Sequence, residues 1–498
     1  MYCLGVSGEF RAYDALPYAG EAYPQTHPSA LFSAAWLLGM SPAEPRRCRV
    51  LELGCADGTN LIAMAAGLPQ STFVGIDGSA VQVASGQALI DQAGLENVTL
   101  QTADLRSLGS LGTFDYIIAH GVYSWVAADA QAALLSLCAD ALAPQGVAYV
   151  SYNALPGWHS CRMVRDLMRY HSRKFDTIPE QLRQARAVLR FVAESAIGEH
   201  HAATLSAFVP YLDRIDDDYL FHDYLEENNQ PMLAWDFAQD AAAAGLAYLG
   251  DAELHRMAGL NLPETVRAAI EGFTDDPLRQ EQYLDFITDR TLRRTLLCRP
   301  GMVLQRDLEL HRAHRLCYSS GLVEVEGSDP VCFRHRRTQD AVVITDPVHL
   351  AALRLLQAQA PRPVPFSALA AAAPGSGLEG LLLQGVLQGV IQPHSDSPPV
   401  TSAIGLRPEV WWLARLQAAS GRSPSTRLHQ TLPLTSAIEP LVISHLDGTR
   451  TVAELQAELL PLIAVDEGDP AAALSAAIAA VLERCARAGL LIRGPHET

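Results

Sequence analysis

The stretch "CRVLELGCADGTNLIAM", residues 48–64, decides the fold of the first part of the chain. Branched and apolar residues at 49–53 predict a buried strand, and the pattern from 59 to 67 predicts a helix. The small residues between them predict a loop whose backbone approaches a ligand closely. The spacing of Gly54, Ala56 and Gly58 differs from the G-x-G-x-x-G of a dinucleotide site, so the neighbouring strands must identify the ligand.

Four further strand patterns follow this stretch, at 72–77, 98–104, 114–120 and 147–153. Helical patterns at 79–94 and 129–142 lie between them. This alternation predicts an α/β fold with a doubly wound, Rossmann-like parallel sheet. Ligands of such sheets bind at the carboxyl ends of the strands, where the strand order reverses.

The residues that follow the strands form one candidate ligand site. Asp77 follows the glycine loop by about twenty residues, the place of an acid that accepts hydrogen bonds from both ribose hydroxyls. Asp104, after the third strand, is placed to accept from an exocyclic adenine amine. The other predicted ligand contacts at the strand ends are Glu52, Gly54, Cys55, Ala56, Gly58, Gly78, Ser79, Leu105, His120 and Gly121. Gln25 and Thr26, before the first strand, are predicted to contact the ligand as well.

At these strand ends the sequence resembles the class I S-adenosylmethionine-dependent methyltransferases. "ELGCADG" matches the E/D-x-G-x-G-x-G loop of that family, and "GID" and "AD" match its second and third motifs. The resemblance implies S-adenosylmethionine as the cofactor of the candidate site. A loop that cradles a methionine moiety and a ribose holds no pyrophosphate, which explains the spacing. Ala56 stands where the family usually has glycine.

A narrower resemblance covers most of the chain. "YDALPY…YPQTHP" (13–28), "FDYIIAHGVYSWV" (114–126), "VSYNALPGWH" (150–159) and "YLFHDYLEENNQP" (219–231) resemble bacterial methyltransferases with an attached regulatory domain. That group includes protein-lysine methyltransferases of rickettsial outer-membrane proteins. The resemblance implies an N-terminal lid arm (1–42), a methyltransferase core (43–165), a mainly helical regulatory domain (166–335) and winged-helix-like units at 336–398 and 399–498.

Five side chains near the strand ends are candidates for contact with the methyl acceptor: Tyr18, His120, Tyr123, Trp125 and Asn153. A lysine amine is almost wholly protonated at pH 7, so it must be desolvated or lose its proton before it accepts a methyl. Aromatic faces attract a cation and exclude water. We expect no single obligatory base and no metal site. The tyrosine-rich arm is expected to cover the sulfonium, and packing at the sheet edge is the alternative.

Two helical regions after residue 160 are charged. Arg-rich amphipathic patterns at 162–175 and 179–196 predict helices with solvated polar faces. "IDDDYLFHDYLEENNQP" predicts an exposed acidic helix, with a docking surface for a cationic substrate as the alternative. His222 and Glu226 lie one turn apart within it, a metal half-site without a third ligand.

The C-terminal third contains a faint repeat of about 90 residues whose order of elements is that of a winged helix. From Asp340 onward it has ten arginines, no lysine and fourteen acidic residues. DNA recognition needs a basic face, so we expect protein-interaction or dimer modules, including a homodimer, and no nucleic-acid partner. We expect these units to serve substrate capture or assembly and not cofactor binding.

Composition limits the class of protein. The chain has 498 residues, a net charge of −18 and nine cysteines that occur without a C-x-x-C pair. We expect a cytoplasmic bacterial protein with reduced thiols, without an inserted membrane segment. Of its 37 basic residues only Lys174 is a lysine. A GC-rich genome explains this bias, and avoidance of self-methylation is the alternative.

The function expected from the sequence is S-adenosylmethionine-dependent N-methylation of lysine side chains in a protein. Methylation of a small molecule or a peptide-derived biosynthetic intermediate remains open. A cofactor-binding regulator without catalysis is the third alternative.

Overall fold

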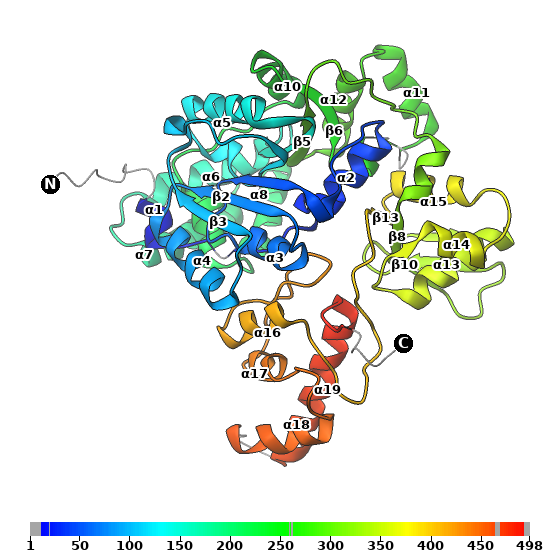
Figure 1. Cartoon of the computed structure of the whole chain (residues 1–498). Helices are drawn as coiled ribbons and strands as arrows, with labels where there is room; N and C mark the ends of the chain where they lie inside the picture. The colour runs from blue at the N-terminus through cyan, green and yellow to red at the C-terminus, as the bar shows by residue number, and fades with distance from the viewer. Residues whose placement is uncertain (1–10, 19, 258, 260–261, 464–468, 493–498) are drawn as a thin grey trace.

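The computed structural model of the chain describes residues 11–18, 20–257, 259, 262–463 and 469–492 (Figure 1). The expected parallel sheet is present. Its strands are β1 (Arg49–Leu53), β2 (Thr72–Asp77), β3 (Val98–Thr102), β4 (Phe114–Ala119) and β5 (Leu142–Asn153). They lie in the order β3-β2-β1-β4-β5, so the order reverses between β1 and β4. This reversal places a binding crevice at the carboxyl ends of β1 and β4.

The helices that connect these strands begin and end at residues suited to caps. They are α3 (Thr59–Gly67), α4 (Ala80–Ala93) and α5 (Ala128–Ala141). Ser79 caps α4 by accepting a hydrogen bond from the Gln82 amide at 3.2 Å, and Gly94 ends it with a φ of 62°. The predicted helix at 79–94 therefore includes its two caps.

The sheet has seven strands, two more than the sequence predicted. β7 (Leu292–Cys298) pairs antiparallel with β5, and β6 (Ala247–Asp251) pairs antiparallel with β7. Both come from the region expected to be mainly helical. Arg293 of β7 is fully buried because Asp285 and Glu281 bind its guanidinium at 2.8 and 2.7 Å. A strand with two adjacent arginines is not recognisable as a buried strand without these partners.

The other elements of the first 300 residues surround this sheet. They are α1 (Arg11–Ala15), α2 (Pro28–Leu37), α6 (Trp158–Ser172), α7 (Ile178–Ser195), α8 (Glu199–Leu212), α10 (Ala234–Ala243), α11 (Glu264–Phe273), α12 (Pro277–Thr288) and the 3₁₀ turns Pro24–Thr26, Pro45–Arg47, Leu105–Ser107, Tyr123–Trp125 and Leu254–Arg256.

One arginine of α6 is not solvated as expected. Arg165 is 3% exposed and donates to the carbonyls of Glu226 and Asn228.

The predicted exposed acidic helix at 215–231 is wrong. The structure has a single α-turn, α9 (Asp217–Leu220), followed by a π-helical turn, Phe221–Leu225. The His222 side chain is 3% exposed because the ring of Tyr13 stacks on it at 4.5 Å. This segment is thus packed against the N-terminal arm, defined here as residues 13–28.

The C-terminal region contains two units. The first has two small sheets, β12-β8-β13 and β11-β10-β9, and the second has only helices among its named elements. Their elements are η8 (Leu310–Arg315), β8 (Cys317–Ser320), β9 (Leu322–Glu324), β10 (Cys332–His335), β11 (Ala341–Val343), α13 (Pro347–Gln359), β12 (Val364–Pro365), α14 (Phe366–Ala372), α15 (Leu378–Leu387), β13 (Ile391–His394), α16 (Trp412–Ala419), α17 (Ile438–Ser444), α18 (Val452–Leu459), η9 (Leu460–Leu462) and α19 (Pro470–Ala488).

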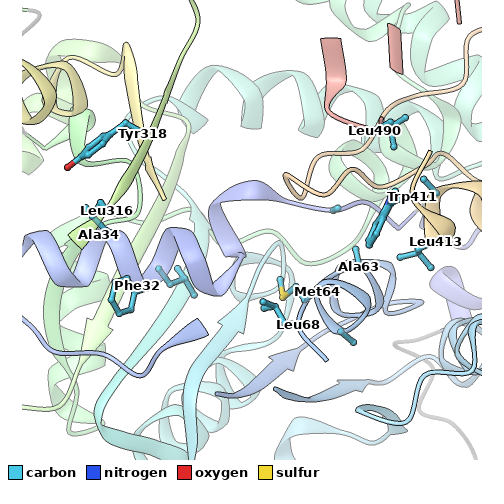
Figure 2. Close-up of a cluster of buried hydrophobic side chains, with 14 of the residues drawn as sticks. Phe32, Ala34, Ala63, Met64, Leu68, Leu316, Tyr318, Trp411, Leu413 and Leu490 are labelled. Atoms are coloured by element: carbon cyan, nitrogen blue, oxygen red, sulfur yellow. The ribbon is translucent and has the colours of Figure 1, made fainter. Parts of the chain in front are cut away.

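The second unit shares a hydrophobic core with the methyltransferase-like sheet region. Figure 1 shows α16 to α19 on the side of α3 and α4. Figure 2 shows Trp411 and Leu413 beside Ala63, Met64 and Leu68, and all five belong to one buried cluster. The second unit is therefore packed against the sheet region through a common hydrophobic core. Across the described ranges, no helix is long and apolar enough to cross a membrane.

The shared core can be tested at two adjacent tryptophans. Trp411 is 2% exposed, whereas Trp412 is 39% exposed. We expect Trp411→Ala to lower the free energy of unfolding by about 3–5 kcal/mol, because it opens a cavity in this core. Trp412→Ala should change it by less than about 1 kcal/mol. Denaturant unfolding of both variants measures this, and equal losses would contradict the shared core.

Candidate active site

The glycine loop after β1 has a left-handed backbone at three positions. The φ angles are 73° at Gly54, 50° at Ala56 and 70° at Gly58. A Cβ at Gly58 would lie 2.7 and 2.9 Å from the side chain of Leu100, and a Cβ at Gly54 would overlap Val122. Glycine is thus required at two positions for space and backbone angle. Ala56 accepts a conformation that an L side chain adopts at some cost.

Asp77, at the end of β2, binds the loop on one side and α4 on the other. One carboxylate oxygen accepts from the Ala56 amide and the other from the Ser79 amide, both at 2.8 Å. Burial raises the pKa of Asp77. The Ser79 hydroxyl donates to Asp14 at 2.6 Å, so the N-terminal arm reaches this strand end. Gly78 lies between the two, half-buried.

Two buried polar atoms at the strand ends lack partners within the part of the chain that the structure describes. Glu52 is 3% exposed; its Oε1 accepts from Asn60 at 2.8 Å and its Oε2 is unpaired. Asn153, 5% exposed at the end of β5, has an unpaired Nδ2. Burial raises the pKa of Glu52 to about 8. Buried unpaired groups are rare, and these two fit a polar ligand with a cationic and an accepting group.

The end of β4 carries His120 and Gly121. The His120 ring lies 4.2 Å from the ring of Tyr23 in the arm. Its Nδ1 is 3.0 Å from the Tyr149 hydroxyl and 3.1 Å from Ser151 Oγ. Burial lowers the pKa of His120 to about 3, so the ring is neutral. The Gly121 amide donates to Ser151 Oγ at 2.8 Å.

Four other predicted ligand contacts already have protein partners. The Gln25 side chain bonds the Tyr149 hydroxyl. Thr26 is fully buried and bonds Asn60, and the Cys55 side chain is packed in the core. Asp104 pairs with Arg106 at 2.6 Å, which lowers its pKa. Leu105, half-buried, begins the next 3₁₀ turn.

The structure corrects one acceptor candidate. Tyr123 is 1% exposed, and its ring packs edge-on against Phe237 at 5.1 Å. It therefore belongs to the core between the sheet and α10, not to an accessible rim. Trp125, two residues later in the same 3₁₀ turn, is half-buried and lies edge-on to Trp158 at 5.9 Å.

The N-terminal arm and the turn at 219–223 form a cluster that the sequence did not predict as a unit. We call Tyr13, Tyr18, Tyr219, His222 and Asp223 the tyrosine–acid cluster. Tyr18 lies 5.5 Å from the His222 ring and 6.2 Å from the Tyr219 ring. His222 Nε2 donates to the Leu16 carbonyl at 2.8 Å.

Asp223 is the acid of this cluster. It is half-buried and accepts a hydrogen bond from Tyr219, while burial raises its pKa to about 6. Its negative charge adds to the burial that raises the pKa of Tyr13 and of Tyr18. The signals in the sequence were the tyrosines of the arm and the repeated tyrosines and acids of "DDDYLFHDYLEE".

His222 and Glu226 do not make a metal site here. Their Nδ1 and Oε1 atoms are 3.7 Å apart. Within the described parts of the chain, no group of three or more histidine, cysteine, aspartate or glutamate side chains is placed to hold a metal ion.

The loop geometry predicts the effect of two matched substitutions. Ala56→Gly should raise the free energy of unfolding slightly, by up to about 1 kcal/mol, because glycine adopts the positive φ without strain. Gly58→Ala should lower it by about 1–3 kcal/mol, because the new methyl group meets Leu100. Thermal unfolding compares them. A destabilised Ala56→Gly variant would show that this loop has another conformation.

The raised pKa of Glu52 predicts a pH dependence of stability. The folded protein keeps this proton between the ordinary value of 4.5 and about 8, where the unfolded chain releases it. Stability therefore falls as the pH rises through this window. Glu52→Gln has no such proton, so the native protein should lose stability relative to this variant as the pH rises. The difference between their free energies of unfolding should shift by about 3–5 kcal/mol in favour of the variant between pH 4 and pH 9. Exposed Glu96→Gln is the control, and a pH-independent difference would contradict the assignment.

Family models match three parts of the chain. A "Methyltransferase domain" matches residues 50–146, a "Predicted methyltransferase regulatory domain" matches 216–299, and a "PKMT, C-terminal winged helix domain" matches 407–490. The solved structure of PKMT2 from Rickettsia typhi in complex with AdoHcy has a TM-score of 0.84. The two sequences are 26% identical, and the match covers 96% of this chain and 100% of the PKMT2 chain.

Two curated relatives come from Rickettsia prowazekii (strain Madrid E). "Uncharacterized protein RP789" is 37% identical over 309 residues, 61% of this chain, and the match spans only 55% of that relative's length. "Uncharacterized protein RP028" is 34% identical over 233 residues, which are 46% of this chain and 93% of the relative. The chain therefore belongs to the class I S-adenosylmethionine-dependent methyltransferases that carry an attached methyltransferase regulatory domain.

Proposed function

We propose that this protein transfers the methyl group of S-adenosylmethionine to a lysine amine of a protein. The observation that carries the acceptor class is the tyrosine–acid cluster, which gathers aromatic rings and a carboxylate around the N-terminal arm. Asp14 of the same arm accepts a hydrogen bond from Ser79 after the end of β2. The likeness to PKMT2, over 96% of this chain, supports a protein acceptor. When bound, S-adenosylmethionine supplies a methyl group activated by a positively charged sulfur.

The residues at the strand ends fit this cofactor. Asp77 and the glycine loop suit the ribose and the methionine backbone. The unpaired Oε2 of Glu52 suits the α-ammonium group, because a cation beside the carboxyl favours its ionised form and releases the proton that the free protein keeps. Asn153 Nδ2, at the end of β5, is a buried unpaired donor that suits an accepting group of the ligand. We infer that Asp104 and Leu105, which follow β3, hold the adenine ring.

The cluster suits a cationic acceptor. The ring faces of Tyr18 and Tyr219 attract an ammonium group and exclude water from it. A carboxylate with a pKa of about 6 is ionised at neutral pH and still basic enough to take a proton. Asp223 therefore holds the ammonium and accepts the proton whose loss frees the nitrogen lone pair. Tyr18, His120, Trp125 and Asn153 are our proposed acceptor-side contacts.

The acceptor class is tested with the full chain and radiolabelled S-adenosylmethionine. A bacterial lysate is separated into protein and small-molecule fractions, and each is incubated with the enzyme. We expect label in protein and methyl-lysine after acid hydrolysis. Label confined to small molecules would replace the proposal with the biosynthetic alternative. Cofactor binding without transfer to either fraction would indicate a regulator.

The role of Asp223 predicts a defined kinetic change. Asp223→Asn should lower kcat on a labelled protein acceptor by about 100-fold, because the variant does not accept the ammonium proton. Its S-adenosylhomocysteine affinity should stay within about twofold, and its kcat should recover as the pH rises toward the lysine pKa of about 10.4. Asp216→Asn, an exposed acid nearby, is the control. A pH-independent loss would contradict proton acceptance by Asp223.

A further inference from the structure

A buried amide on α3 joins three other segments of the chain: the N-terminal arm, β1 and the second C-terminal unit. Asn60, 4% exposed on the first turn of α3, donates from Nδ2 to Glu52 Oε1 at 2.8 Å and to Thr26 Oγ1 at 3.0 Å. Its Oδ1 faces the Tyr23 amide at 3.1 Å and His429 Nε2 at 2.7 Å. His429 belongs to the second C-terminal unit, 369 residues away. We call this set of five residues the Asn60 junction.

The directions of these hydrogen bonds follow from their partners. A backbone amide only donates, so the atom of Asn60 that faces Tyr23 is the oxygen, and the nitrogen faces Glu52. The Asn60 oxygen only accepts, so His429 Nε2 carries a hydrogen. Burial lowers the pKa of His429, which keeps the ring neutral. The junction thus directs Glu52 Oε1 to Asn60 and leaves Oε2 for the crevice.

The loop that carries His429 is built to hold one conformation. His429 has a positive φ of 58°, which is uncommon for a residue other than glycine. The Thr426 hydroxyl accepts from the amides of Leu428 and Gln430 at 3.2 and 3.1 Å. Gln417 binds both the amide and the hydroxyl of Ser425 in the buried base of the loop.

Two further contacts from the same segment reach the site. Arg422 donates to Asp57 of the glycine loop at 2.5 Å and to Ser85 of α4 at 2.7 Å. Thr431 Oγ1 accepts from the Ala22 amide of the N-terminal arm at 2.8 Å. Residues 422–431 therefore contact the loop and the arm directly and the Glu52 carboxyl through Asn60.

We propose that the second C-terminal unit is part of the cofactor site: His429 positions Glu52 through Asn60, and Arg422 positions the glycine loop through Asp57. This inference rests on the proposed function, because the ligand concerned is S-adenosylmethionine. His429 and Arg422 are positioning residues and touch no reacting atom. A winged helix that only captured substrate would need the apolar contact at Trp411 and none of these buried polar bonds.

The test uses the full chain and calorimetry with S-adenosylhomocysteine. His429→Leu removes the donor and should weaken binding by about tenfold, since losing one buried bond with its acceptor left unpaired has that effect. His429→Gln keeps an N–H donor and should bind within about twofold of the native protein. His335→Leu, at a histidine 8% exposed in β10, is the control for general destabilisation and should also bind within about twofold.

A second readout follows the pH dependence of unfolding without ligand. The Asn60 bond favours the ionised form of Glu52, so in His429→Leu the midpoint of the Glu52-dependent change should move to higher pH. It should stay unchanged in His429→Gln and in His335→Leu. If His429→Leu does not fold, Arg422→Gln, at a partly exposed surface position, carries the test and should weaken binding by about fivefold.

The outcomes separate the two proposals. Failure of the native protein to bind S-adenosylmethionine or S-adenosylhomocysteine refutes the proposed function. Normal native binding that is unchanged in His429→Leu and in Arg422→Gln refutes the positioning role alone. Equal losses in His429→Leu and His429→Gln also refute it, because they would show that the imidazole only fills space.

Discussion

The side chain of Asn60 is the constraint on which the site geometry depends. A buried amide needs partners for both its nitrogen and its oxygen, and an unpaired one costs about 1–3 kcal/mol. Here the partners come from β1, the N-terminal arm and the second C-terminal unit. Because the Tyr23 amide only donates, it fixes which way the Asn60 amide faces, and the three elements fit together in one arrangement. Glu52, which has the unpaired oxygen, is fixed by the same arrangement.

The regulatory region is joined to the sheet by a second set of buried polar bonds. β7 continues the hydrogen-bonded ladder of β5, and the ion pairs of Arg293 fasten α12 to that strand. Earlier in the chain, the turn at 219–225 packs against the N-terminal arm, where Tyr13 and His222 stack. The proposed acceptor site therefore lies between two segments about 200 residues apart, and neither forms it alone.

Local sequence was enough to predict the core of the fold. The strands at 49–53 and 72–77 and the helix at 59–67 have the bounds that periodicity indicated. Glycines with positive φ and the caps of α4 obey rules that act within a few residues. For the same reason the acids Glu52, Asp77 and Asp104 were predicted at the ends of their strands. These features depend on neighbours along the chain, so a single sequence contains them.

Only the tertiary structure decided which side chains meet. Tyr123 and Trp125 look equivalent in the sequence, but the 3₁₀ turn puts the first in the core against Phe237. His222 was expected on an exposed helix, but the ring of Tyr13 covers it. Arg293 is buried because its acidic partners are buried beside it. No local pattern marks His429 as a partner of Asn60. Sequence alone determined where the glycine loop lies. Which side chains surround it was decided by buried polar groups far apart in the sequence, because each of them needs a specific partner.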